Sequence, residues 1–343
     1  MKIHSKSLWL YFIPALLISV ISGCSEIDRG GLQPSTGGTN ELIVVTNSDE
    51  NWNGRMGQTI REFFGKDVPG LPQPEPMFNL VHISEPNFSK MLQTHHNIFI
   101  VDINDKFTKP LLETKKDLWA SPQRVVKMTV PDKDTFFKEF NKNKEAFLEL
   151  FHSNERRRVN EAYGSIEDYK ITNLLKKKYD IDILIPKSFY IAVEKKNFVW
   201  LRREAERFSQ GIIIYTYPYT DTIAFNYNRI LEIRDSITKK YIPGPSEGSF
   251  MKVSTVELPV MKRIEFNGMF AVEMRGLWEL DGDFMGGPFL NLTLVDEPRH
   301  RVVTVDGFVY NPSQEKRDLV RQLEALIYTL SFPDSTAITP EQK

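Results

Sequence analysis

The chain has 343 residues, a formal net charge of −1, 41% apolar and 26% charged residues, and a single cysteine, Cys24. This charge balance gives no support to nucleic-acid binding, which requires a basic footprint. One cysteine excludes an intramolecular disulfide, and a chain of this length and apolar content can bury one large core or two moderate ones.

The N-terminal residues have the pattern of a secretory signal peptide, residues 1–23. A basic head at residues 2–6 precedes the apolar run Leu8–Ile21, which is shorter than the roughly 20 residues that span a bilayer. The tetrapeptide Ile21-Ser22-Gly23-Cys24 resembles the lipobox of bacterial lipoproteins. The resemblance implies that Cys24 receives a diacylglycerol on its thiol, that the chain is cut before it, and that the new amino terminus is acylated with palmitate. The alternative is an ordinary secretory signal with a chance cysteine.

Cleavage before Cys24 leaves 42 Lys and Arg residues against 45 acidic residues and, once the thiol is lipidated, no cysteine for catalysis or metal binding. Residues 24–40 are rich in Gly, Ser, Thr and Pro, so they are predicted to form a lipidated flexible tether with an end-to-end distance of about 20–24 Å. Two or more acyl chains hold a protein firmly on a membrane. We therefore expect the protein in the cell envelope, anchored in the outer membrane on its periplasmic or its surface face.

The first folded region, residues 41–165, is predicted to be an α+β domain. Apolar segments predict strands at 41–46, 77–84, 97–103 and 123–130. An apolar face predicts a helix at 53–64, a helical turn is expected at 86–93, and a long charged helix, broken once, is expected at 131–163.

The second region, residues 178–333, is predicted to be another α+β domain, followed by a disordered tail at 334–343. Strands are expected at 181–185, 188–194 and 212–219, helices at 197–210 and 223–241, and an antiparallel meander at 269–280, 289–295 and 301–310. An amphipathic helix capped by Asn311 closes the domain. The fold class is α+β with two mixed sub-domains. Because both regions begin strand–helix–strand, we also consider an old duplication.

The segment LWELDGDFMGGPF, residues 277–289, carries three alternating carboxylates, Glu279, Asp281 and Asp283. Alternate residues of a strand share a face, so these groups could hold Ca²⁺ or act as an acid and base pair. A plain hairpin is the structural alternative, because the Asp-Gly turn and the Gly286-Gly287-Pro288 bend need flexible residues.

A third interpretation of the same segment is a loop that binds a partner protein. Large apolar side chains are concentrated on this Gly-rich turn, as they are in interface hot spots. These side chains belong to Trp278, Phe284, Met285 and Phe289.

Three further groups of residues are weighed against simple structural roles. The Pro-rich stretch LPQPEP, residues 71–76, is predicted to be a rigid docked connector, with a presented ligand as the alternative. The basic runs 156–158 and 176–178 are predicted to be solvated helix faces, with contact to an anionic membrane as the alternative. The last group is three histidines considered together with Asp102, which we interpret as structural rather than metal-binding. His82 lies among the apolar residues of a strand, and the side chains of the adjacent His95 and His96 are expected to diverge.

Familiar enzyme motifs are missing from the sequence: there is no nucleophile elbow, zinc-protease motif, phosphate loop or dinucleotide fingerprint. Six stretches, NWNGRMGQTIREFFG, LPQPEP, WASPQRV, NERRR, WELDGDFMGGPF and VDGFVYNPSQEKRDLVRQLEALIYTL, together resemble the Bacteroidota lipoproteins of domain-of-unknown-function family 4837, over nearly all of 41–332. The resemblance implies an envelope lipoprotein and no catalytic residues.

The sequence as a whole predicts a non-catalytic envelope lipoprotein that uses no cofactor and binds another protein. The membrane anchor, the tether and the aromatic Gly-rich loop support this prediction. The alternative is an envelope enzyme or a glycan- or Ca²⁺-binding protein that uses Glu279, Asp281 and Asp283.

Overall fold

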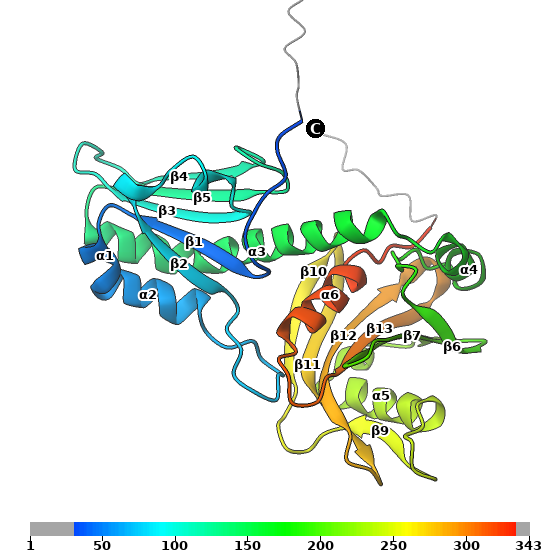
Figure 1. Cartoon of the computed structure of the whole chain (residues 1–343). Helices are drawn as coiled ribbons and strands as arrows, with labels where there is room; N and C mark the ends of the chain where they lie inside the picture. The colour runs from blue at the N-terminus through cyan, green and yellow to red at the C-terminus, as the bar shows by residue number, and fades with distance from the viewer. Residues whose placement is uncertain (1–30, 334–343) are drawn as a thin grey trace, which may run out of the picture. The chain divides into compact units, whose positions relative to one another are not determined.

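The computed structural model describes residues 31–333, and its first sheet has five strands in the order β2-β1-β3-β5-β4 (Figure 1). All neighbouring strands are parallel except β4 and β5. β1 is apolar and almost wholly buried, as expected for a strand in a largely parallel sheet. The strands are β1 Glu41–Thr46, β2 Asn79–Ser84, β3 Asn97–Ile103, β4 Leu111–Lys116 and β5 Arg124–Val130.

Short helices follow the first strand and connect the next two. They are α1 Asp49–Asn53, α2 Arg55–Phe64, η1 Glu85–Asn87 and η2 Leu92–Thr94. α2 has the apolar face that the sequence predicts, and its Phe64 ring makes edge-on contacts with Phe99 of β3 and with Phe140 and Phe151 of the long helix α3.

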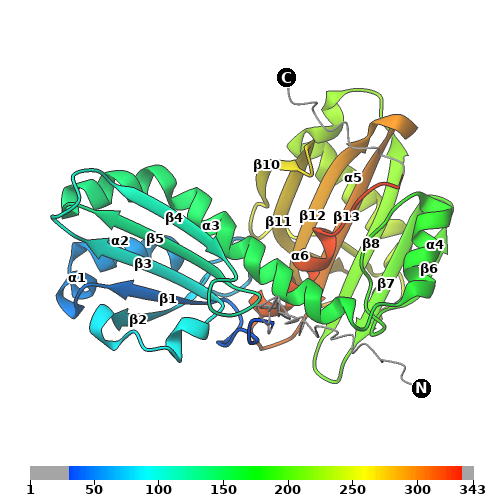
Figure 2. The ribbon, with the colours of Figure 1, turned by 90° about the horizontal axis from the view of Figure 1, so that it is seen from above.

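The helix α3, Lys133–Gly164, runs without a break for 32 residues, or about 48 Å. Asp132 caps its start by accepting a 2.7 Å hydrogen bond from the backbone of Thr135. Its first half packs on the N-terminal sheet, and its second half is bonded to the last helix, for example through Tyr163 and Gln322 (Figure 2). The expected break in this helix is therefore wrong, and α3 connects the two sheets.

The second sheet is antiparallel throughout, in the order β10-β11-β12-β13-β8-β7-β6, with β9 added alongside β11. Its meander of β11, β12 and β13 agrees with the prediction. The strands are β6 Tyr190–Lys195, β7 Phe198–Glu204, β8 Ser209–Pro218, β9 Phe250–Val253, β10 Val260–Phe266, β11 Met269–Asp281, β12 Gly286–Asp296 and β13 Arg301–Tyr310.

Helices cover both faces of this sheet (Figure 1). Alternate residues of β8 show the division, since Ile212 and Ile214 face the core under α6, whereas Ile213 and Tyr215 face the core under α5. The helices are α4 Tyr169–Tyr179, η3 Thr222–Phe225, α5 Tyr227–Tyr241, η4 Glu297–Arg299 and α6 Arg317–Ile327. The predicted α+β class, with a meander closed by a C-terminal amphipathic helix, is confirmed.

The predicted helix at 197–210 is wrong, because this stretch forms the β7–β8 hairpin. Phe198 to Leu201 are four consecutive buried residues, which suits a strand covered on both faces better than an amphipathic helix. Gly211, which we expected to end a helix, lies inside β8, where a Cβ atom would meet the Phe308 ring at 2.2 Å. The shared strand–helix–strand order that suggested a duplication is therefore absent.

Other differences lie at the edges of elements. Residues 181–185 make only an isolated bridge to Ser331, and the last helix begins at Arg317 rather than after Asn311. Residues 33–40, expected to belong to the flexible tether, form isolated bridges from Pro34 to Ser121 and from Thr36 to His95, in the segments just before β5 and β3. The described chain from Gln33 onward forms one compact unit, and its largest apolar core contains side chains from both sheets.

The predicted signal peptide, the predicted lipidation site Cys24 and the predicted disordered tail at 334–343 lie outside the described residues. Between residues 31 and 333, none of the helices is both long and apolar enough to cross a membrane.

Candidate functional site

The β11–β12 hairpin separates the four residues of the predicted partner loop. Trp278 and Phe289 are 3% and 1% exposed, so they belong to the core rather than to a surface. The indole Nε1 of Trp278 donates a 3.2 Å hydrogen bond to the carbonyl oxygen of Val309. Phe284, by contrast, is fully exposed at the turn, and Met285 is half-buried beside it.

Glycines fix the base of this hairpin. A Cβ atom at Gly287 would meet the carbonyl oxygen of Val309 at 2.0 Å, and one at Gly286 would meet the carbonyl oxygen of Trp278 at 2.9 Å. Gly282 has φ +82°, a conformation that side chains other than glycine rarely adopt. The hairpin therefore holds Phe284 in solvent on a closely packed base.

The three candidate carboxylates do not converge. Lys252 of β9 lies 2.9 Å from Asp281 and 3.6 Å from Glu279, and its hydrogen bond to Asp281 raises the pKa of the Lys252 ammonium. Asp283 instead accepts a 2.6 Å hydrogen bond from Ser246. Among residues 31–333, no group of three or more His, Cys, Asp or Glu side chains is placed to hold a metal ion.

An apolar cavity of about 400 Å³ lies at the base of the hairpin. Trp278, Leu280 and Met285 of the hairpin form part of its wall, and Trp200 of β7 forms another part. The remaining apolar lining comes from the end of α5, β9 and β13, through Ile242, Pro243, Pro245, Met251, Phe308 and Tyr310. This size and lining are typical of sites that take a small molecule or a side chain.

The cavity also has polar groups. Trp200 is 7% exposed, and its buried Nε1–H has no hydrogen-bond acceptor within the described chain. Ser209 and Tyr310 bring hydroxyl groups to the lining. Arg202 forms an ion pair with Glu204, and its guanidinium lies 4.9 Å from the Trp200 ring centroid. The cavity thus has an apolar wall with hydroxyl groups and one ion pair beside it, whereas the unpaired Nε1–H of Trp200 is enclosed by the protein and not open to the cavity.

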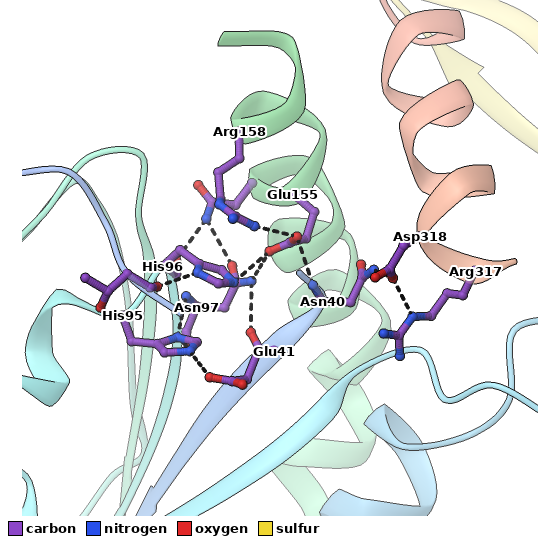
Figure 3. A network of polar contacts seen from close by, with 11 residues as sticks. Asn40, Glu41, His95, His96, Asn97, Glu155, Arg158, Arg317 and Asp318 are labelled. Carbon is purple, nitrogen blue, oxygen red and sulfur yellow. Dashed lines mark hydrogen bonds and ion pairs between the residues drawn. The ribbon is translucent and has the colours of Figure 1, made fainter. Parts of the chain in front are cut away.

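A second polar site surrounds the histidine pair of the N-terminal sheet (Figure 3). His95 and His96 are buried and stacked with their ring centroids 4.4 Å apart, so the expectation that they diverge is wrong. His95 lies 2.6 Å from Glu41, and His96 contacts Glu155 at 3.1 Å. Asp102 pairs instead with Lys127, at 3.5 Å.

The histidine pair fastens the segment 33–40 to the sheet. The His96 ring donates a 2.6 Å hydrogen bond to the backbone carbonyl of Thr36, and the backbone N–H of Asn40 donates to Glu155 at 3.1 Å. Burial lowers the pKa of His95. Burial opposes ionisation of Glu155, but its hydrogen bond with His96 and the nearby Arg158 keep the pKa of Glu155 below its ordinary value.

His82 is also structural. Its ring stacks on Trp52 at 4.7 Å and hydrogen-bonds the hydroxyl of Thr46 at 2.9 Å. Burial lowers its pKa, against the opposing effect of Asp49.

A buried ionic cluster joins α3, β11 and α6. Glu324 is 1% exposed and lies 3.0, 2.9 and 2.7 Å from Arg156, Arg275 and Arg321, respectively. Burial raises the pKa of Glu324, but the three guanidinium groups outweigh it and hold that pKa well below its ordinary value. The prediction that residues 156–158 form a solvated face is therefore wrong.

The run 176–178 is more exposed than 156–158. Lys176 and Lys178 are about half exposed and form ion pairs with Asp182 and Glu194, respectively. No sequence motif indicated the ionic cluster or the histidine network, because their members come from elements far apart in the chain.

Two family models match the chain. Residues 168–329 match "Domain of unknown function (DUF4837)", and residues 35–164 match "Domain of unknown function (DUF8532)". Both matched families are of unknown function, and neither match covers half of the chain. The match to DUF4837 agrees with the family number noted in the sequence over the C-terminal part, whereas the N-terminal part matches a different family.

No curated protein matches the chain. Among solved structures, a mutant of the protein Mog1 is 11% identical, covers 46% of this chain and 92% of its own, and has a TM-score of 0.28. The Saccharomyces cerevisiae Ran-binding protein Mog1p is 11% identical, with coverages of 45% and 90% and a TM-score of 0.27. Scores this low carry no implication for function.

Proposed function

We propose that this protein is a lipid-anchored, non-catalytic component of the bacterial cell envelope that binds another protein. In this proposal Cys24 carries the lipid, the anchor lies in the outer membrane, and the source is a Bacteroidota species. The lipobox and the apolar run before it support the anchor. The match of residues 168–329 to a family of unknown function is compatible with the proposal and adds no activity.

The observation that supports binding is the placement of Phe284. Its ring is fully exposed, yet it sits on a hairpin whose neighbours Trp278 and Phe289 are buried. Burying a Phe side chain stabilises a protein or a complex by about 1.5–3 kcal/mol. Folding does not bury Phe284, so this stabilisation is available only when a partner covers the ring. Exposed aromatic residues on a well-ordered base are frequent anchors of protein interfaces.

The structure gives less support to the alternative of an enzyme or a glycan- or Ca²⁺-binding protein. That alternative needs Glu279, Asp281 and Asp283 to act together. Lys252 occupies the space beside the first two, and the third faces Ser246. The hairpin therefore favours the binding proposal.

Photo-crosslinking at the hairpin tests the proposal in cells. Benzoylphenylalanine at position 284 should give one discrete adduct, because the ring is fully exposed. Met91 on the N-terminal half is 78% exposed, so the same substitution there is a matched control. An absent adduct at 284, or an identical set of adducts at both positions, would contradict the proposal.

Labelling with a clickable palmitate analogue tests the anchor. The native chain should be labelled and the Cys24→Ala variant should not. A mature amino terminus at any residue other than Cys24 would exclude the lipid anchor.

A further inference from the structure

We infer that the end of the N-terminal sheet at which segment 33–40 enters the fold is the membrane-facing surface of the protein, and that it lies on a bilayer containing anionic phospholipid. We call this surface the rim; it consists of Lys90, Met91, Lys115, Lys116 and Leu118. This inference rests on the proposed function, because it takes Cys24 as the attachment point of the lipid.

The length of chain after Cys24 keeps this end of the sheet close to the membrane. Gln33 follows Cys24 by nine residues, and nine residues span at most about 30 Å even when fully extended. Gln33 is fixed to the fold, since its carbonyl oxygen accepts a 3.0 Å hydrogen bond from the backbone N–H of Ser121. A lipid on Cys24 therefore holds the loop that contains Ser121 within about 30 Å of the bilayer.

Hydrogen bonds hold the two loops of the rim together. Met91 lies in the turn before η2, and Leu118 lies in the loop between β4 and β5. The side-chain amide of Gln123, at the end of the β4–β5 loop, donates to the backbone carbonyl oxygens of Gln93 and His95 at 2.6 and 2.7 Å. Both loops are therefore fixed at the same end of the sheet.

The rim combines exposed apolar side chains with positive charge. Met91 is 78% exposed and Leu118 is 42% exposed. Lys90, Lys115 and Lys116 are exposed as well, and none of them forms an ion pair among residues 31–333. At an anionic bilayer, apolar groups enter the boundary of the acyl chains while ammonium groups approach the phosphates, so this combination suits a membrane surface.

The acidic group nearest to the rim lysines in the chain does not cancel their charge. Asp117, which directly follows Lys116, accepts a 3.1 Å hydrogen bond from Arg157. Arg124, at the start of β5, adds another cation, half-buried close to Arg157. The rim therefore favours an anionic partner, and a phospholipid surface is the one that a lipid on Cys24 brings within reach.

This orientation agrees with the proposed role of the β11–β12 hairpin. In Figure 1, segment 33–40 enters the fold at the top of the view, whereas β11 ends at the bottom. A bilayer at the rim therefore leaves the exposed ring of Phe284 on the side that faces away from the membrane, where a partner protein can reach it.

The inference is tested with the processed chain, residues 24–343, coupled through Cys24 to a maleimide phospholipid in vesicles of phosphatidylethanolamine and phosphatidylglycerol. Cys24 is the only cysteine, so the coupling places the anchor at its native position without depending on lipidation in the cell. Benzoylphenylalanine at position 118 should then form photo-adducts with phospholipid, which mass spectrometry detects.

Phe107 offers a matched control for this position. It is 38% exposed and lies before β4, at the opposite end of that strand from Lys116. The same substitution at position 107 should give at most a minor lipid adduct. Equal lipid adducts at both positions, or no lipid adduct at 118, would overturn the inference.

Charge variants show whether the rim lysines act on the bilayer. The triple variant K90Q/K115Q/K116Q should reduce the yield of lipid adduct at 118 by about fivefold or more at low salt, because each lysine is attracted to anionic headgroups. A control that changes the net charge equally replaces three exposed lysines of α3, in the triple variant K133Q/K138Q/K142Q. Equal yields in the two triple variants would overturn the inference.

This test is separate from that of the proposed function. A lipid adduct at 118 on the vesicles, without palmitate labelling in cells, keeps the rim and removes the native anchor. Palmitate labelling without a lipid adduct at 118 keeps the anchor and removes the rim as the membrane-facing surface. In cells, an adduct of position 118 with a protein instead of lipid would also overturn the assignment of the rim to the membrane.

Discussion

The carboxylate of Glu75 accepts a 2.7 Å hydrogen bond from the backbone N–H of Arg317, 242 residues further along the chain. It also accepts from the backbone N–H of Lys316 at 2.8 Å. These are the first amide groups of α6, which have no partner inside the helix. The Pro-rich stretch 71–76 thus presents a charged cap to the last helix, and Glu75 itself is 3% exposed.

Glu75→Ala should lower the free energy of unfolding by about 1–2 kcal/mol, because it removes an N-terminal cap and leaves buried amide groups unsatisfied. Urea unfolding followed by circular dichroism measures this change. Glu315→Ala is the matched control, since Glu315 is exposed in the same turn. Equal stability of the two variants would contradict the assigned role of Glu75.

This cap also shows where prediction from sequence ends. The apolar stripe of the last helix was evident, but the helix was expected to start after Asn311, whose side chain instead bonds the backbone of Glu315 at 2.7 Å. The residue that caps α6 belongs to the other half of the chain. The apolar pattern of the sequence therefore predicts that α6 exists, but not the residue at which it begins.

The same limit applies to the candidate site. A hairpin was one interpretation of residues 277–289, and β11 and β12 form it, but the sequence pattern could not tell buried from exposed aromatic residues, because both faces of this sheet are covered by helices. The cavity depends on Trp200, in a stretch that was predicted to be helical. A run of consecutive buried residues has no period of two, which is the signal that identifies a half-exposed strand.

Glu324→Gln should strongly destabilise the fold, by about 3–5 kcal/mol, because three buried guanidinium groups would lose their shared carboxylate. Thermal and urea unfolding measure the loss. Glu149→Gln is the control: Glu149 also pairs with Arg156, but its side chain is 60% exposed, so the expected loss is about 0–1 kcal/mol. Similar losses in both variants would show that the cluster is not a joint between α3 and α6.

Gly37→Ala should detach the segment 33–40 from the sheet. Gly37 has φ +108°, and a Cβ atom there would meet the His95 ring at 2.1 Å. We expect a local cost of about 1 kcal/mol or more, and so amide hydrogen exchange in this segment that is faster by about fivefold or more. A Cβ atom at Gly31 meets nothing within 4 Å, so Gly31→Ala should exchange like the native chain. Unchanged exchange in Gly37→Ala would contradict the clamp.

Mild acid should weaken the same clamp. Burial lowers the pKa of His95 from its ordinary value of 6.5, so the folded state binds fewer protons than the unfolded state as the pH falls through that value. Stability is then present above about pH 6.5 and decreases below it. Glu155, whose pKa is also lowered, adds a further loss at more acidic pH, as the pH falls from its ordinary value of 4.5 through its value in the fold.

The pH dependence can be measured by hydrogen exchange of residues 33–40 between about pH 7.5 and 5.5, a range that brackets the ordinary histidine pKa, with correction for the intrinsic exchange rate. Protection should fall as the pH decreases. In His95→Gln, which keeps polar groups near Glu41 and Asn97 but cannot gain a proton, the fall in protection should be smaller, because the imidazole whose pKa is lowered by burial is no longer present. Protection that stays constant in the native chain, or that falls equally in both proteins, would show that His95 does not control the attachment of this segment.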